Sequence, residues 1–302
     1  MKKLILATAI AGLTASTVAT AATVYEKDDL TLSVQGDYQV QLYQEIGDDK
    51  DLDVNYDDLE LKFGAVYNLS NGMTAFGQLD LDWNGQGDGF GDADSDEIID
   101  EAYVGLKMGG FTTSLGRQYW GSDDFGVEKA YEMNGGTAFG ITGGNDTIKF
   151  GYESSRFNAT LSHDLEDNDD EKATDLFVST KFGPAKVGLA YQDYQEAPGT
   201  DSVETTGIMA SFDVGRANVG IDYSTNDDVD YTNAAVSFPI RGKTSAAIGA
   251  TLVSPDVGDD ATQWYLNATH KLHDNVSVFA EIGDNDVDNT DVGYLTGMQV
   301  TF

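Results

Sequence analysis

The chain of 302 residues contains no cysteine, only 4 prolines and 3 histidines, and just 17 basic residues against 52 acidic ones. The absence of cysteine excludes a disulfide scaffold, a thiolate nucleophile and a cysteine-ligated zinc site. The formal net charge of −35 argues against a nucleic-acid partner, because phosphate binding requires a basic surface. The length allows one large domain or two ordinary ones.

Long apolar runs are also missing. After residue 21 no stretch of about 18 consecutive apolar residues occurs, which excludes a transmembrane helix. At the start of the chain, residues 1–3 include two lysines, residues 4–13 form a short apolar run, and Ala19 and Ala21 offer the small residues that a signal peptidase reads. This order favours a signal peptide over a buried helix. We expect cleavage after Ala21 or one residue later, so that residues 1–21 are removed and residues 22–302 form the mature domain.

What the sequence does contain is a repeated alternation of apolar and polar residues. Between residues 30 and 42 the even positions are apolar or glycine and the odd positions are polar, which is typical of a strand with one apolar and one polar face. We count sixteen such strands and no convincing amphipathic helix outside the signal. The other fifteen strands are predicted at 59–69, 73–83, 102–108, 111–115, 148–152, 157–161, 176–182, 185–191, 208–214, 217–223, 234–238, 246–252, 264–272, 276–282 and 292–302.

The connections between these strands alternate in length. Seven are tight turns, at 70–72, 109–110, 155–156, 183–184, 215–216, 239–243 and 273–275. Eight are longer and acidic, at 47–56, 84–97, 118–146, 166–173, 195–203, 225–230, 254–261 and 284–290. A soluble sandwich has no reason to separate short turns from long loops, whereas an outer-membrane barrel has short periplasmic turns and long external loops.

The apolar and polar faces of the strands indicate what surrounds such a barrel and what it encloses. The chain has no helices to cover sixteen apolar sheet faces, so we expect these faces to contact lipid and the polar faces to line water. Hydrocarbon surroundings require complete backbone pairing, which a closed sheet provides. Sixteen strands enclose a space too wide for side chains to fill. The pattern therefore predicts an all-β, 16-stranded antiparallel transmembrane β-barrel around an aqueous channel.

Short motifs add a family resemblance. The segments 22–28 (ATVYEKD), 102–107 (AYVGLK) and 115–119 (LGRQY), together with a last strand that ends in Phe302, resemble the Gram-negative general porins. The resemblance covers the mature chain in architecture, with its motifs at both ends and around 102–119. It implies a homotrimer of 16-stranded barrels in the outer membrane, surrounded by lipid and lipopolysaccharide. It also implies that Phe302 is a signal for the outer-membrane assembly machinery.

The resemblance further implies that the third long loop folds inward and narrows the channel. The connection at 118–146 is the longest in the chain and follows the Gly-Arg-Gln-Tyr motif. Its glycines, at 135, 136, 140, 143 and 144, would let it turn back into the barrel. We expect its acidic residues to face the narrowest part of the channel, namely Asp123, Asp124, Glu128 and Glu132. The alternative is a flexible external loop.

General porins place basic residues on the wall opposite this loop, and here the sequence departs from the family. Side-chain parity predicts that the wall is mainly acidic, with Asp37, Glu60, Lys62, Gln78, Asp80, Glu101 and Lys107 as candidates. Arg117 matches the family's Gly-Arg position, yet strict alternation puts it on the face of Leu115 unless a bulge at Gly116 or the end of the membrane band intervenes. A channel lined by carboxylates favours cations. Adaptation to a saline habitat would explain the acidic loops equally well, but the lumen positions less well.

Other functions have weaker support. The spacing of Asp92, Asp94 and Asp96, or of Asp284, Asp286 and Asp288, suits calcium but matches no complete EF-hand loop. The three histidines have no nucleophile partner and no Gly-x-Ser-x-Gly elbow occurs, so we expect no enzyme, no cofactor and no metal. We expect passive diffusion of small hydrophilic solutes and inorganic ions. The alternatives are a substrate-selective channel, for instance for oligosaccharides, with Tyr43, Phe76, Tyr103, Phe177 and Tyr265 in the lumen, and an adhesin or structural anchor.

Overall fold

The computed structural model describes residues 21–83, 98–165, 172–197 and 199–302. The predicted signal peptide, apart from Ala21, and the acidic triplet Asp92, Asp94 and Asp96 lie outside these residues. The strands are β1 (Ala22–Lys27), β2 (Leu30–Gln44), β3 (Asp53–Asn68), β4 (Met73–Asp82), β5 (Ile99–Met108), β6 (Phe111–Tyr119), β7 (Gly143–Glu153), β8 (Phe157–Asp164), β9 (Lys172–Phe182), β10 (Ala185–Gln195), β11 (Val203–Val214), β12 (Ala217–Thr225), β13 (Val229–Arg241), β14 (Thr244–Pro255), β15 (Ala261–His273), β16 (Val276–Asn285) and β17 (Gly293–Thr301). Two short 3₁₀ helices, η1 (Ser70–Gly72) and η2 (Gly121–Asp124), complete the elements.

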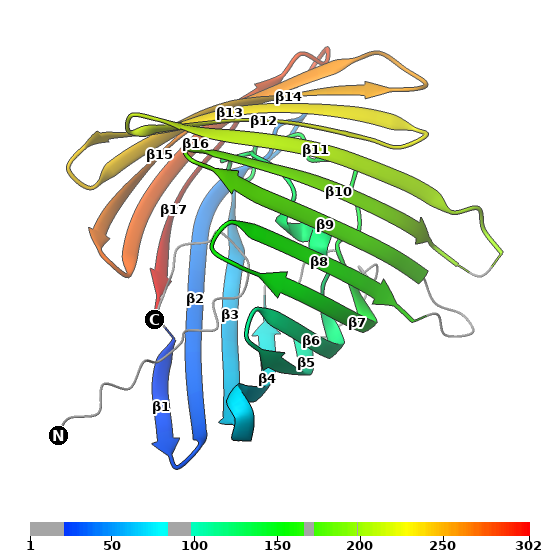
Figure 1. Cartoon of the computed structure of the whole chain (residues 1–302). Helices are drawn as coiled ribbons and strands as arrows, with labels where there is room; N and C mark the ends of the chain where they lie inside the picture. Colours follow the sequence, from blue (N-terminus) through cyan, green and yellow to red (C-terminus); the bar gives the residue numbers. More distant parts are fainter. Residues whose placement is uncertain (1–20, 84–97, 166–171, 198) are drawn as a thin grey trace.

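The sheet closes on itself at β2. The C-terminal part of β2 pairs with β17, while its N-terminal part pairs with β1 along the same edge. Between these two stretches, Phe302 exchanges two backbone hydrogen bonds with Gly36, at 2.9 and 3.0 Å. β1 and β17 lie one after the other along the same edge of β2 and together fill one strand position. The 17 strands therefore form a closed antiparallel barrel with 16 strand positions (Figure 1).

The sixteen predicted strands are all present, as β2 to β17. The structure adds β1, which the alternation did not predict because residues 22–27 are too few to show a clear period. Short turns connect one end of the strands, and several place a glycine where the chain must adopt a left-handed conformation. Gly183 in the β9–β10 turn, for example, has a φ of 61°, which residues with a side chain rarely adopt.

The two faces of the barrel have opposite chemistry. On β9 the side chains of Asp175, Phe177 and Ser179 are buried on the inner face, while Leu176 on the alternate face is 39 % exposed. The same pattern holds on neighbouring strands, where Leu189 and Ile208 are 58 % and 56 % exposed on the outside. Because apolar side chains are favoured out of water, the exposed outer face suits contact with lipid. The inner face encloses a polar lumen. Among the described residues, no helix has the length and apolar character needed to cross a membrane.

Candidate functional site

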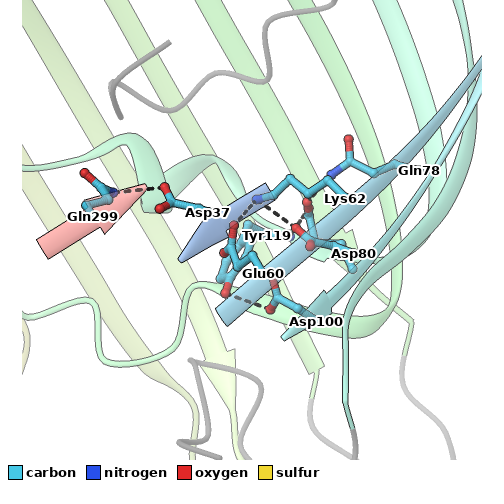
Figure 2. A network of polar contacts seen from close by, with 9 residues as sticks. Asp37, Glu60, Lys62, Gln78, Asp80, Asp100, Tyr119 and Gln299 are labelled. Carbon is cyan, nitrogen blue, oxygen red and sulfur yellow. Dashed lines mark hydrogen bonds and ion pairs between the residues drawn. The ribbon is translucent and has the colours of Figure 1, made fainter. Parts of the chain in front are cut away.

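A row of charged side chains lies on the lumen face of the first strands. Asp37 of β2 is in register with Glu60 of β3, and Lys62 of β3 is in register with Asp80 of β4. Residues in register on antiparallel strands share a face, so these side chains gather on one part of the inner wall (Figure 2). We call the group formed with Asp100 and Glu101 of β5 the charged wall.

Lys62 joins two of these carboxylates. Its Nζ atom lies 3.1 Å from Glu60 and 2.7 Å from Asp80. Asp80 is completely buried beneath it, whereas the side chains of Glu60 and Lys62 are 21 % and 30 % exposed toward the lumen. At the edges of the group, Gln299 donates a hydrogen bond of 2.9 Å to Asp37, and the Tyr119 hydroxyl donates one of 2.9 Å to Asp100 (Figure 2).

A β-bulge brings two consecutive acids of β5 to the same wall. The register between β4 and β5 shifts between Leu79 and Leu81, and a shift of this kind turns a neighbouring residue toward the other face. Asp100 thus offers an oxygen within 4.8 Å of Glu60 and Asp80. Glu101 accepts a hydrogen bond of 2.7 Å from Gln78 and one of 3.4 Å from the Tyr119 backbone. The wall carries five carboxylates against one lysine.

The segment between β6 and β7, residues 120–142, packs against lumen-facing side chains on the other part of the barrel. Phe125, Val127 and Phe139 form one buried apolar cluster with residues of β9, β10 and β11. Met133 forms a second cluster with residues of β15, β16 and β17. Tyr131 stacks on Phe279 with ring centroids 4.1 Å apart.

Buried carboxylates hold the backbone of the 120–142 segment. Glu281 of β16 accepts hydrogen bonds of 2.8 Å from the backbone N–H groups of Tyr131, Glu132 and Met133. Asp222 of β12 accepts one of 2.8 Å from Val127, and Asp175 of β9 accepts one of 3.0 Å from Ser122. Hydrogen bonds to ionised acceptors are stronger than neutral ones. The segment is therefore anchored to strands far apart around the barrel.

The four acids predicted on this segment have different surroundings. Asp123 is exposed, accepts a hydrogen bond from Thr142, and lies within electrostatic range of Lys149 and Lys62. Asp124 is half-buried, and burial together with the charge of Asp123 raises its pKa to about 7.

Glu128 is half-buried. Glu132 contacts β2 and β3, where it accepts a hydrogen bond from Gln41 and shares one with Asp57. Burial raises the pKa of Glu132, since a carboxyl that is removed from water favours its neutral form. Asp123 is close enough to Lys62 of the charged wall for an electrostatic interaction, whereas Glu132 contacts residues of β2 and β3.

Two wall candidates lie outside the charged wall. Lys107 sits at the end of β5, one residue before the strand ends at Met108. Arg117 follows Gly116, which has a φ of 132° and marks a register shift between β6 and β7. The β5–β6 register places Arg117 opposite Ala102, and its Nε atom donates a hydrogen bond of 3.0 Å to the Asp100 carbonyl. Their contribution to the channel stays a prediction.

Sequence reasoning missed several members of the site. Asp100, Tyr119 and Lys149 belong to the wall region, and the carboxylates that anchor the 120–142 segment were not singled out either. One signal was available for Asp100: two consecutive acids, Asp100 and Glu101, come directly before the alternating residues 102–108, so one of them would face lipid unless a bulge intervenes. No comparable signal marks the anchoring carboxylates, because their partners are backbone groups distant in sequence.

A closed barrel with an apolar exterior, a polar interior and a charged inner wall defines a membrane channel of the outer-membrane type. Comparison with known proteins gives the family. The description "Gram-negative porin" belongs to a family model that matches residues 7–290. The chain belongs to the Gram-negative porin family.

Individual relatives agree with this assignment. The chain is 29 % identical to porin-like protein H of Photobacterium profundum over an alignment that covers 100 % of both proteins. It is 27 % identical to a monosaccharide porin of a Halomonas species, over 62 % of this chain and 56 % of that protein.

Solved structures share the fold at low identity. The trimer form of the outer membrane protein OmpT of Vibrio cholerae superposes with a TM-score of 0.77 and 19 % identity, covering 91 % of this chain and 100 % of that one. An anion-selective porin from Comamonas acidovorans gives a TM-score of 0.72 and 13 % identity, covering 90 % and 100 %. Because an anion-selective protein shares the fold, ion preference must be argued from the side chains.

Proposed function

We propose that this porin forms a water-filled channel for the passive diffusion of small hydrophilic solutes and ions, with a preference for cations. The observation that carries the proposal is the charged wall, where Glu60 and Asp80 contact Lys62 (Figure 2) and the carboxylates of Asp37, Asp100 and Glu101 lie within electrostatic range of it. Carboxylates at the wall of a narrow passage attract cations and repel anions.

We also propose that the 120–142 segment is an inward-folded loop that constricts the channel. Support comes from its hydrogen bonds to lumen-facing residues of β9, β12 and β16, and from Glu132, which reaches Gln41 on β2. An external loop would not contact strands this far apart around the barrel. The passage would run between this segment and the charged wall, with Asp123, Asp124 and Glu128 on the segment side.

Liposome swelling tests the diffusion function. Vesicles that contain the folded protein should swell in isotonic solutions of small uncharged sugars, and the rate should fall smoothly as solute size increases. This is expected because a water-filled passage discriminates mainly by its width. Vesicles with a deletion of residues 125–139 should admit larger solutes. Rates for the intact protein equal to those of protein-free vesicles would contradict the proposal.

A monosaccharide-selective channel is the second candidate, since a relative carries that name. Two of the aromatic residues expected in the lumen are, however, covered by the 120–142 segment: Phe177 and Tyr265 are 0 % and 1 % exposed. The Tyr265 hydroxyl accepts a hydrogen bond from the Lys129 backbone N–H, so this side chain does not face a solute. If the channel has a specific sugar site, added monosaccharide should occupy it and reduce the ion current in a saturable manner. A solute flux that does not saturate with concentration and that depends only on solute size favours general diffusion instead.

Assembly in the outer membrane completes the proposal. We propose a homotrimer, surrounded by lipid and lipopolysaccharide, that is exported with a cleaved signal peptide and inserted by the assembly machinery through recognition of Phe302. The surface at β3 to β6 supports the trimer, because a mainly apolar hollow there includes the small outward-facing residues Ala65, Ala75 and Gly77 between larger ones such as Tyr67 and Leu106. A second copy can approach closely over small side chains.

A further inference from the structure

Three carboxylates of the charged wall are close enough to share one cation. Glu60, Asp80 and Asp100 each offer one oxygen, and these oxygens lie within 4.8 Å of one another. Calcium binds oxygen ligands at about 2.3–2.6 Å, so oxygens around one ion are separated by at most twice that length. The spacing of the three oxygens is therefore within the range that a common calcium ion can bridge.

Asp80 supplies independent evidence for a ligand. Its side chain is 0 % exposed, and its Oδ1 atom has no hydrogen-bond partner among the described residues. Its other oxygen, Oδ2, contacts Lys62 at 2.7 Å. Buried carboxylate oxygens are normally hydrogen-bonded, and an exception requires an explanation.

Among the described residues, Asp37 Oδ1 and Glu128 Oε2 are also buried without a hydrogen-bond partner, whereas three other carboxylates of the barrel have both oxygens occupied. Both oxygens of Glu281 accept hydrogen bonds from the 120–142 segment or Asn267. Asp222 is satisfied by Val127 and Asn233, and Glu101 by Gln78 and Tyr119. Asp80 thus differs from these three carboxylates, and within the group of Glu60, Asp80 and Asp100 it is Asp80 that has a buried, unpaired oxygen.

We propose that Glu60, Asp80 and Asp100 form a calcium-binding site in the wall of the lumen. The ligand set contains only oxygens, which suits a hard cation such as calcium rather than zinc. Glu60 stands at the partly exposed rim and gives the ion access from the lumen. With few protein ligands and water to complete the shell, the dissociation constant for calcium should be about 10⁻⁴ to 10⁻³ M, as in extracellular calcium modules.

Lys62 competes with the metal in this site. Its ammonium group contacts Glu60 and Asp80, so calcium must displace it from these oxygens or bind beside a positive charge. The Lys62→Met variant keeps the aliphatic stem and removes the charge. This variant should bind calcium about tenfold more tightly, because the substitution removes the solvent-screened repulsion between the ammonium group and the calcium ion.

Terbium luminescence tests the site in the folded, detergent-solubilised full-length barrel. The Tyr119 hydroxyl lies 2.9 Å from Asp100 and should sensitise Tb³⁺ bound to the three carboxylates, with calcium displacing the signal. The Asp80→Asn and Asp100→Asn variants should lose this component, and Lys62→Met should strengthen it. Glu101→Gln is the matched control, because it removes a neighbouring charge whose oxygens are already occupied.

The outcomes separate a site from diffuse charge. Loss in Asp80→Asn with retention in Glu101→Gln supports the proposal, provided that both variants show the heat-dependent mobility of folded barrels. Equal losses in the two variants, or an unchanged signal in Asp80→Asn, overturn it. Isothermal titration with calcium, in which the wild type must bind and Asp80→Asn must not, provides a second readout. Neither measurement depends on ion conduction, so failure here is distinct from failure of the channel proposal.

Discussion

Single side chains determine how much negative charge the channel presents. Asp124 is the clearest case on the 120–142 segment, since burial and the neighbouring Asp123 raise its pKa to about 7. A carboxyl with a raised pKa is neutral below that value and ionised above it. In the proposed channel, Asp124 would therefore add its charge mainly at neutral and alkaline pH.

This behaviour predicts a pH-dependent ion preference. On acidification from about pH 8 to about pH 6, Asp124 takes up a proton, and the preference for cations should decrease. The zero-current potential in a KCl gradient, measured across this pH range, checks the prediction. In the Asp124→Asn variant the potential should change less over the same interval, because one of the titrating carboxyls is removed. An identical pH profile in variant and wild type would assign the titration to another group.

Phe302 acts at the point where the barrel closes. Its ring lies over Gly36, where an added Cβ atom would come within 2.3 Å of it, and it contacts the Tyr38 ring edge-on at a centroid distance of 5.6 Å. Deletion of Phe302 should therefore reduce the amount of folded protein in the outer membrane. Fractionation of cell envelopes measures this yield. Phe302→Tyr keeps the ring and should restore it, and a normal yield of the truncated chain would refute the assembly role.

At the level of elements, the position of the 120–142 segment depends on a few charged anchors. Glu281 is 3 % exposed and accepts three backbone N–H groups of the segment. In the Glu281→Gln variant the amide loses the negative charge and turns a donor toward at least one N–H. The loss of one hydrogen bond to a charged group costs about 1.5–3 kcal/mol, which is enough to loosen the segment locally.

We expect a protease to cut the Glu281→Gln variant faster within the 120–142 segment during limited proteolysis. Its single-channel currents should also be noisier. Glu204→Gln is the matched control, because Glu204 is exposed on β11 and shares the outward parity of Ile208. The barrel itself should keep its resistance to unfolding. Equal protease resistance in the two variants would show that the apolar clusters alone hold the segment.

The strands were predictable from the sequence, whereas the details of the wall were not. Period-two alternation is a local property, and it located β2 to β17 because each strand must present apolar residues to lipid. A bulge shifts this parity by one residue, as on β5, where Asp100 and Glu101 together oppose Asp80 of β4, and that shift decides that Asp100 joins Asp80. The contacts of Glu281 depend on how a distant segment folds, which no local pattern encodes.

At the scale of the whole molecule, the outer surface is as informative as the lumen. The hollow over β3 to β6 predicts the contact between protomers, so filling it should weaken the trimer. Ala75→Trp should convert SDS-resistant oligomers to monomers at lower temperature than the wild type, as seen by gel mobility after graded heating. Ala250→Trp, on the outer face of β14, is the control and should leave the oligomer intact. A monodisperse monomer of the wild type in mild detergent would contradict the trimer while leaving the barrel intact.

The central claim is a cation-preferring channel whose selectivity arises between the 120–142 segment and the charged wall. Neutralising the segment acids, in the triple variant Asp123→Asn, Asp124→Asn and Glu128→Gln, should reduce the preference. A variant with three changes in an exposed loop, Asp256→Asn, Asp259→Asn and Asp260→Asn, removes the same number of carboxylates far from the passage. The difference should fade in concentrated salt, since the Debye length falls from about 10 Å at 0.1 M to about 3 Å at 1 M.

The zero-current potential of the reconstituted protein in a KCl gradient tests this claim most directly. A cation-preferring channel should give a wild-type potential of the sign set by K⁺ permeation, a large shift toward zero in the segment variant, and a small shift in the loop variant. Equal shifts in the two variants would place the selectivity in diffuse vestibule charge. A wild-type potential of the sign given by Cl⁻ permeation would contradict the account.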